Sequence, residues 1–156
     1  MAMATATLMD HQEQTQQDDA EIRAVIERLH QAHHDKDVQA IAASYAQDAA
    51  IFNLAPPLRH TGINLQEKQA WLDSWNGPIE IKPSDLSITI SGDVAFCHCY
   101  LRMIGEPKSA PQRVDFWMRE TLCLSREAGS WRIVHEHTSV PFYMDGSLRP
   151  AFDLKP

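Results

Sequence analysis

Polar side chains alternate along the stretch WRIVHEHTSVPF, residues 131–142. Successive residues of an extended chain point to opposite faces, so His135 and His137 share one face while Glu136 and Thr138 share the other. An imidazole exchanges protons near neutral pH or binds a metal ion, and a carboxylate can act as a general base. The face that looks into the protein therefore decides which chemistry this strand supports.

A metal site is one chemistry that these residues raise. His135 and His137 form an H-x-H pair, and His98 is a third histidine on an earlier predicted strand. Three histidines with an open position are typical of a zinc site. If His98 faces inward while the pair faces outward, however, the three side chains cannot bind one ion. We therefore predict no metal site, and the absence of a CxxC motif and of a Gly-rich phosphate loop predicts no cofactor.

The composition fits a single domain with a substantial core. The chain has 156 residues, of which 44% are apolar. A net charge of −7 and scattered Lys and Arg residues argue against nucleic acid and anionic membranes as partners. No window is apolar and long enough to span a bilayer, and no secretory signal is recognised. We expect a disordered leader over residues 1–17, a domain over 18–142, a tail over 143–156, and a cytoplasmic location with reduced cysteines.

Hydrophobic periodicity predicts helices first and strands afterwards. Apolar residues at helical spacing predict helices over 18–34, 38–46 and 64–76, with a short strand over 49–54. From residue 79 the period changes to two, which predicts strands over 79–92, 94–105, 113–125 and 131–140. Short turns between these strands favour one antiparallel sheet, and the helices before it make the fold class α+β.

Three segments resemble the SnoaL-like and ketosteroid-isomerase-like branch of the NTF2-like superfamily. They are AIAASYAQDAAIFN (40–53), HTG (60–62) ahead of a predicted helix, and the closing stretch 131–142, and the resemblance spans roughly residues 18–142. It implies an NTF2-like cone, in which three N-terminal helices pack on a strongly curved antiparallel sheet and enclose a hydrophobic pocket. It also implies a homodimer formed through the outer face of the sheet.

The resemblance further implies positions for catalytic groups, and this sequence departs from them. In the steroid isomerases a carboxylate base lies on the first strand, and a tyrosine and a protonated acid form the oxyanion hole. Carried over by position, these groups fall on Asn53, near Leu29 and near Thr121. Because an amide cannot abstract a proton, we do not expect the steroid isomerase mechanism with these residues.

The resemblance also implies which strand faces line the pocket. On the strands over 94–105 and 113–125 it assigns to the pocket the side chains Phe96, His98, Tyr100, Asp115, Trp117, Arg119 and Thr121. Two registers stay open for the last strand. In the favoured one Glu136 faces inward and pairs with Arg119, since an unpaired buried charge is costly. If a bulge shifts the register by one residue, His135 and His137 face inward instead.

These residues lead to two hypotheses of different class. In the first, the pocket binds a small apolar carbonyl or carboxylate compound and isomerises, cyclises or hydrates it without a cofactor, with His98, Arg119 and Glu136 as catalytic residues. In the second, the protein is a non-catalytic ligand-binding or dimeric assembly module, and Arg119 and Glu136 only form a structural pair. The predicted ligand-binding residues are Tyr45, Phe52, Asn53, Trp71, Trp75, Tyr100, Asp115, Trp117, Thr121 and His137.

Overall fold

The computed structural model describes the backbone of residues 2–110 and 112–156 and the side chains of residues 12–110 and 112–156. The meander of long strands follows the helices, as predicted. The elements are helices α1 (Ala2–His34), α2 (Val38–Ala43) and α3 (Leu65–Asp73), and strands β1 (Tyr45–Phe52), β2 (His60–Thr61), β3 (Trp75–Ser91), β4 (Val94–Pro107), β5 (Val114–Glu127) and β6 (Ser130–Ser139).

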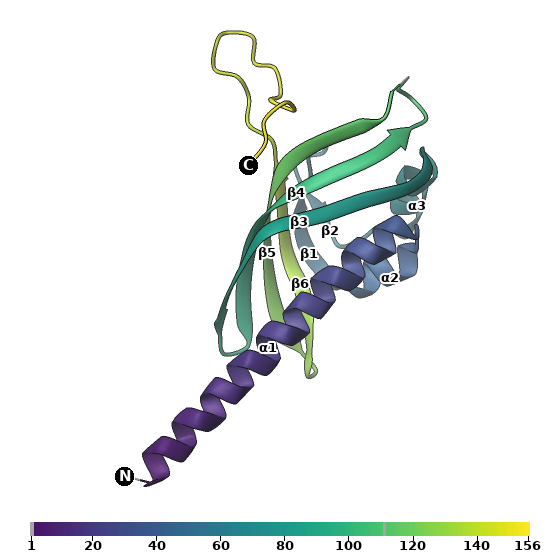
Figure 1. The fold of residues 1–156 in the computed structure, drawn as a ribbon. Coiled ribbons are helices and arrows are strands. Elements are labelled where there is room, and N and C mark those ends of the chain that lie inside the picture. The colour runs from purple at the N-terminus through teal and green to yellow at the C-terminus, as the bar shows by residue number, and fades with distance from the viewer. Residues whose placement is uncertain (1, 111) are drawn as a thin grey trace.

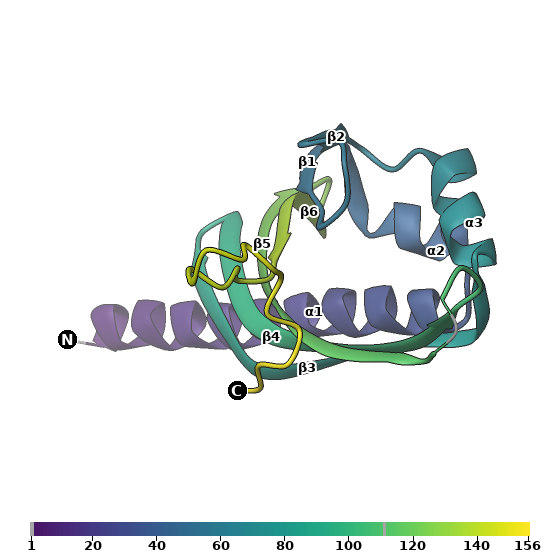
Figure 2. The same cartoon turned by 90° about the horizontal axis from the view of Figure 1, so that it is seen from above.

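One curved sheet organises the molecule. In the described residues it has six strands in the order β2-β1-β6-β5-β4-β3. Neighbouring strands are antiparallel, except that β1 and β6 are parallel. The sheet is strongly bent, α1 runs along β3, and α2 and α3 lie together at one end of the sheet (Figure 1 and, from above, Figure 2). The predicted α+β cone of helices on a curved sheet is therefore confirmed.

Helix α1 packs on the sheet through an apolar stripe. Ile22, Val25, Ile26 and Leu29 are each at most 4% exposed and belong to the same core as the inner residues of the sheet. Their spacing of i, i+3, i+4 and i+7 keeps them on one side of the helix. The helix begins at Ala2, whereas the sequence predicted a start at residue 18, so the backbone of residues 2–17 of the predicted leader belongs to α1. The side chains of residues 1–11 lie outside the described part.

Helix α2 is shorter than predicted, and this changes the place of a key tyrosine. Asp37 caps the helix by accepting hydrogen bonds from the backbone N–H groups of Gln39 and Ala40 at 3.1 and 3.0 Å. The helix ends at Ala43, and Tyr45 already begins β1 beside β6. Strand pairing therefore takes over three residues before the predicted end of the helix.

Helix α3 also ends early. Asn64 caps its start, as its side chain accepts hydrogen bonds from two backbone N–H groups of the first turn at 3.1 Å. The helix ends at Asp73 rather than at residue 76, and Trp75 pairs with Pro107 as the first residue of β3. Sheet pairing again outweighs the helical pattern at the boundary.

The inner face of the central strands is the apolar one. The buried side chains of β4 and β5 are Ala95, Cys97, Cys99, Leu101, Met103, Ile104, Met118, Glu120, Leu122 and Leu124. The alternate residues Phe96 and Tyr100 are 48% and 42% exposed, and His98 is exposed as well. The prediction that Phe96, His98 and Tyr100 face inward is therefore wrong. Helix α1 covers the face with the larger apolar area because this removes the most apolar surface from water.

A bulge in β6 lets two kinds of residue share the inner face. Trp131 and Ile133 are buried in the core, and further along the strand Glu136 and Thr138 also face inward. The pairing of β5 with β6 shifts between Ile133 and His135, so one extra residue enters β6 there. Without it, strict alternation would put Ile133 and Glu136 on opposite faces.

An ion-pair cluster fixes α1 to the end of the sheet away from α2 and α3. Arg126 of β5 pairs with Asp18 and Glu21 of α1 and with Asp93 in the β3–β4 turn. Its guanidinium group also lies 4.6 Å from the ring centre of Trp131. Asp18 is only 4% exposed, and its charge is tolerated there because it is paired and hydrogen-bonded.

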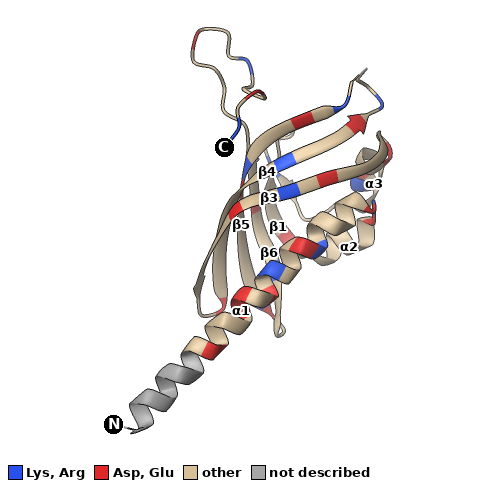
Figure 3. Ribbon diagram, viewed as in Figure 1, with Lys and Arg blue, Asp and Glu red and all other residues tan. Residues whose placement is uncertain are grey.

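Charged residues are interspersed rather than gathered by sign. Figure 3 shows residues of both signs on α1 and across β3, β4 and β5. This distribution agrees with the scattered Lys and Arg residues of the sequence. No helix in the described residues is both long and apolar enough to cross a membrane.

Two glycines with the same backbone angle give a test of the packing at β1. Gly62 and Gly77 both have a φ of 64°. A Cβ added at Gly62 would collide with the carbonyl oxygen of Gln47, whereas one added at Gly77 meets no atom of the described residues within 4 Å. We expect Gly77→Ala to lower the free energy of unfolding by about 1–2 kcal/mol, the cost of a positive φ for alanine. Gly62→Ala should lower it by about 3 kcal/mol or more, because this substitution also forces the backbone of Gln47 to move. Urea denaturation followed by tryptophan fluorescence measures both, and equal losses would contradict the predicted clash.

Candidate functional site

A cavity of about 320 Å³ lies between the concave face of the sheet, α1, α3 and the segment 53–64. Its apolar walls include Leu29, Ile51, Trp71, Ile81, Leu101, Met103 and Met118, and its polar groups include His30, His33, Tyr45, Lys68, Glu120, Glu136 and Thr138. Asn53, Leu54, Pro56 and Asn64 are exposed residues at its border. This size, with a few polar groups in an apolar wall, is typical of a small-molecule site.

Glu120 is a buried acid on the cavity wall. It lies on β5 opposite Thr138 of β6 and is 4% exposed. Burial, together with the negative charge of Glu136, raises the pKa of Glu120 from 4.5 to about 8. The thiol of Cys99 lies 3.5 Å from its Oε2 and donates a weak hydrogen bond. The Glu120 side chain therefore keeps its proton at neutral pH and can donate a hydrogen bond.

Glu136 is the second carboxyl group of the cavity, and its surroundings differ. It lies on β6 opposite Leu122, which makes it a diagonal neighbour of Glu120 across the two strands. The hydroxyl of Tyr45 donates a hydrogen bond to its Oε2. This hydrogen bond fixes the orientation of the Glu136 carboxyl group. Burial and the charge of Glu136 raise the pKa of Tyr45 well above 10, so its hydroxyl remains the donor.

Lys68 brings an amine to the same cavity from α3. It precedes Trp71 by three residues, a spacing that puts both side chains on one side of the helix. Its Nζ lies 4.5 Å from the ring centre of Trp71. Burial lowers the pKa of Lys68, and the negative charge of Glu136 opposes this effect.

Two histidines of α1 reach the cavity in the neutral form. The Nδ1 of His33 lies 2.8 Å from the carbonyl oxygen of Leu29; it must donate to that oxygen, so Nε2 carries the lone pair. Burial, and then the charge of Lys68, lower the pKa of His33 to about 3, and burial lowers that of His30 to about 4. The Nε2 atom of His30 is buried and has no hydrogen-bond partner among the residues that the structure describes.

Some of the predicted site residues do meet at this cavity. Those that line it are Tyr45, Asn53, Trp71 and Glu136. Glu136 faces inward, as favoured, but it does so beyond a bulge in β6 that the favoured register did not contain. Trp75 does not line the cavity but supports it from behind, since its ring centre lies 5.7 Å from that of Trp71 and the residue is 9% exposed.

The other predicted residues lie on the outer face of the sheet. They are Phe52, His98, Tyr100, Asp115, Trp117, Arg119, Thr121 and His137. The predicted pair of Arg119 with Glu136 is wrong, because Arg119 is exposed and its Nε donates a hydrogen bond to Ser139 Oγ at 3.1 Å. His98 lies opposite Thr121 and points away from the cavity. The homodimer through this face stays a prediction.

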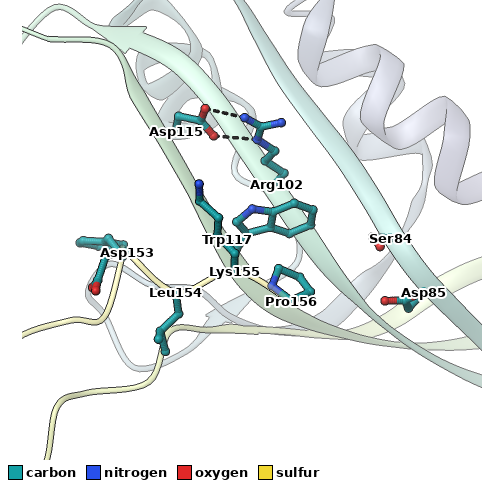
Figure 4. Close-up of a pocket in the computed structure, with 10 residues that line it drawn as sticks. Ser84, Asp85, Arg102, Asp115, Trp117, Asp153, Leu154, Lys155 and Pro156 are labelled. Carbon is teal, nitrogen blue, oxygen red and sulfur yellow. Dashed lines mark hydrogen bonds and ion pairs between the residues drawn. The ribbon is translucent and has the colours of Figure 1, made fainter.

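Asp115 and Trp117 border a second hollow, of about 770 Å³, on the outer face. Figure 4 shows the carboxylate of Asp115 paired with Arg102, whose Nε and Nη2 donate hydrogen bonds at 2.8 and 2.7 Å. The C-terminal residues 152–156 form the other wall, and the ring of Phe152 lies 4.7 Å from that of Phe116. The tail therefore lies against β5 and not across the mouth of the inner cavity.

Glu120, Lys68 and His33 are cavity residues that the sequence analysis did not place in the site. A signal existed for Glu120, because its neighbours two positions away on the strand are apolar and a carboxyl group on such a face is rarely left exposed. A signal existed for Lys68 as well, since it lies one turn before Trp71, which was predicted to line the pocket. No such signal in the sequence pointed to His33, because the burial of His33 depends on where α3 packs.

The side chains of the cavity are suited to proton transfer rather than to binding a metal ion. No group of three or more His, Cys, Asp and Glu side chains in residues 12–110 and 112–156 is arranged to bind a metal ion. Glu120, Glu136, Tyr45 and Lys68 instead form a set of proton donors and acceptors around an apolar space, and Glu67 is an exposed third carboxyl group at its border. Such a set can bind a carbonyl group and transfer a proton.

Comparison with known proteins points to one family. The model of the SnoaL-like domain matches residues 22–143. An NTF2-like protein of unknown function from Pseudomonas putida KT2440 is 32% identical, over 88% of this chain and 95% of that one, with a TM-score of 0.77. A "putative ketosteroid isomerase" from Shewanella frigidimarina is 25% identical, over 74% and 92% of the two chains, with a TM-score of 0.62.

A further structural match concerns the fold alone. A "putative scytalone dehydratase" from Novosphingobium aromaticivorans is 12% identical, over 89% of this chain and 94% of that one, with a TM-score of 0.73. No match was found among curated proteins.

Glu120 should make the stability of the protein depend on pH. Because its pKa is raised from 4.5 to about 8, the unfolded chain releases a proton in this range that the native state keeps. The free energy of unfolding should therefore fall as the pH rises through the range, by at most about 1.4 kcal/mol per pH unit. His30 and His33 oppose this below pH 6.5, because their lowered pKa values leave only the unfolded chain protonated there.

Urea denaturation between pH 7 and 8, where the histidines of the unfolded chain are mostly neutral, isolates the effect of Glu120. The wild type should lose stability with rising pH, and Glu120→Gln, which keeps the shape of the protonated acid, should remove the slope. Glu106→Gln is the matched control, because Glu106 is exposed on β4 and outside the cavity. If the slope survives in Glu120→Gln, Glu120 is not the group that titrates.

Proposed function

We infer, for a chain that belongs to the SnoaL-like family of the NTF2-like superfamily, that the cavity binds a small apolar carbonyl compound and moves a proton on it. The reaction class is an isomerisation, or an addition or elimination of water, that needs no cofactor. The observation that carries this proposal is the pair of carboxyl groups, Glu120 and Glu136, in one cavity. Burial keeps Glu120 protonated, whereas Glu136 accepts a hydrogen bond from Tyr45, so the site offers an acid and an oriented carboxyl group that can serve as a base.

Glu136 is the proposed general base. The hydrogen bond from Tyr45 orients its carboxylate on the cavity wall. A carboxylate in this position takes a proton from the carbon next to the carbonyl group, and the electron pair moves onto the carbonyl oxygen. In this scheme the base comes from the last strand, so Asn53, the counterpart of the steroid isomerase base, need only donate or accept hydrogen bonds at the mouth.

Glu120 is the proposed acid. Because burial keeps it protonated near neutral pH, it can donate a hydrogen bond to the oxygen on which negative charge develops. A neutral acid does this without adding a second negative charge beside Glu136. The two residues therefore divide the roles of acid and base in the way that the first hypothesis requires, with Glu120 in place of His98 and Arg119.

The walls of the cavity support an apolar substrate of limited size. Leu101, Met103, Met118 and Trp71 give it apolar surface, and about 320 Å³ suits a compound of about two fused rings. The relative from Shewanella frigidimarina carries the name of a ketosteroid isomerase, which supports a carbonyl compound as the substrate class.

Hydrogen–deuterium exchange next to a carbonyl group tests the proton transfer without knowledge of the natural substrate. The probe is 2-tetralone, an apolar two-ring ketone, followed by proton NMR in buffered D₂O near neutral pH. We expect the wild type to accelerate the exchange, and Glu136→Gln to lose about 100-fold of the protein-dependent rate, because a general base contributes about 10²–10⁴-fold. Tyr45→Phe should lose about tenfold, since it removes only the group that orients the base.

The control and a binding measurement separate the outcomes. Glu106→Gln should keep the wild-type rate, because Glu106 is exposed and outside the cavity. Exchange that persists in Glu136→Gln would falsify the role of Glu136. If the wild type quenches or shifts the fluorescence of 2-naphthol but does not exchange 2-tetralone, the proposal of catalysis fails and the non-catalytic ligand-binding function is supported.

A further inference from the structure

We propose that Lys68 is a nucleophilic amine that forms an imine with an aldehyde or ketone held in the cavity. This inference rests on the proposed function in one respect, that the bound molecule carries a carbonyl group. It adds a covalent step that the acid–base pair does not require, and it narrows the substrate class. Aldehydes and unhindered ketones form imines, whereas carboxylates do not.

The position of the amine is the first support. Lys68 lines the cavity from α3, and its Nζ lies 4.5 Å from the ring centre of Trp71. Among the described residues it forms no ion pair with a nitrogen–oxygen distance of 4.0 Å or less. The amine is therefore held against an aromatic wall beside the space for a ligand, and no carboxylate of the described residues lies within ion-pair distance of it.

No other lysine offers this arrangement. Lys36 donates a hydrogen bond to a backbone carbonyl at 2.7 Å, and Lys82 pairs with a carboxylate at 2.6 Å. Lys108 is exposed, and Lys155 borders the outer hollow. Lys68 is thus the lysine that lines the inner cavity.

The environment also favours the free amine. Burial lowers the pKa of Lys68, because an ammonium ion is less stable in an apolar pocket than in water. The negative charge of Glu136 acts in the opposite direction. Since burial is the larger effect, more of the uncharged amine is present at neutral pH than for an exposed lysine, and the uncharged amine is the nucleophile.

The acid and base of the cavity complete the step. The nitrogen lone pair of Lys68 forms the C–N bond while the carbonyl π pair moves to oxygen, and a proton passes from nitrogen to that oxygen. Glu120 then protonates the resulting hydroxyl group, which leaves as water as the nitrogen lone pair closes the C=N bond. The products are a protonated imine, the Glu120 carboxylate and one water molecule, so atoms and charge balance.

The imine strengthens the proton transfer of the proposed function. A protonated imine withdraws electrons more strongly than a carbonyl group, so the neighbouring C–H bond becomes more acidic. Glu136 takes that proton to give a neutral enamine, and returning a proton at another carbon isomerises the compound. Water then hydrolyses the imine and releases the free lysine.

Reductive trapping tests the covalent step directly. The wild-type protein is incubated near neutral pH with 6-methoxy-2-naphthaldehyde and sodium cyanoborohydride, which reduces a protonated imine to a stable secondary amine. Peptide mass spectrometry then locates the label. We expect Lys68 to be labelled about tenfold faster than the exposed Lys108, and 2-naphthol in excess to suppress the label at Lys68 alone. Labelling spread over the exposed lysines with Lys68 unmodified would overturn the proposal.

A charge-conserving variant separates an imine from a purely electrostatic role. Lys68→Arg keeps the positive charge but cannot form an imine, and Lys108→Arg is the matched control. We expect Lys68→Arg to lose about tenfold or more of the 2-tetralone exchange rate while Lys108→Arg keeps it. If Lys68→Arg exchanges as the wild type does and Glu136→Gln does not, direct enolisation is the mechanism; the imine is then excluded and the proposed function stands. Trapping on the wild-type protein gives a result even if the variant does not fold.

Discussion

The structure depends on burying the apolar face of one curved sheet beneath α1. That face carries Leu101, Met118, Leu122 and their apolar neighbours, and the stripe of α1 closes over it. Glu120 shares the face with these residues, because residues two apart on a strand cannot be separated. The energy gained from apolar burial therefore holds a carboxyl group inside the protein that would otherwise prefer water, and the raised pKa of Glu120 is the consequence.

The cavity collects polar groups from elements that are distant in the sequence. Glu120 and Glu136 come from the last two strands, Tyr45 from the first, and Lys68 from the helix between them. Glu120 contacts the thiol of Cys99, Glu136 accepts a hydrogen bond from the phenol of Tyr45, and Lys68 lies over the indole of Trp71. The bulge in β6 is essential to this arrangement, since it keeps Ile133 in the core and still turns Glu136 inward.

The order of elements could be predicted from periodicity, but the faces of two strands could not be predicted from family resemblance. The change from helical to alternating spacing located the helices and the meander to within a few residues, apart from the start of α1. His98 and Arg119 were assigned to the pocket because the family arrangement was followed. The hydrophobic alternation around Glu120 indicated the opposite face, and burial of apolar area decides which face the helices cover. The register of the last strand depended on a bulge, which no local pattern specifies.

By itself the sequence determined the fold class and the set of chemical groups available, because periodicity and residue type are local properties. It also determined that the base of the steroid isomerases is absent, since Asn53 stands at that position. Only the tertiary structure decided which groups meet. It put Glu120, Glu136 and Lys68 around one cavity and turned His98 to the outer face. The physical reason is that a side chain's exposure and pKa depend on which elements pack against it, and that packing minimises the apolar surface of the whole chain rather than of any one segment.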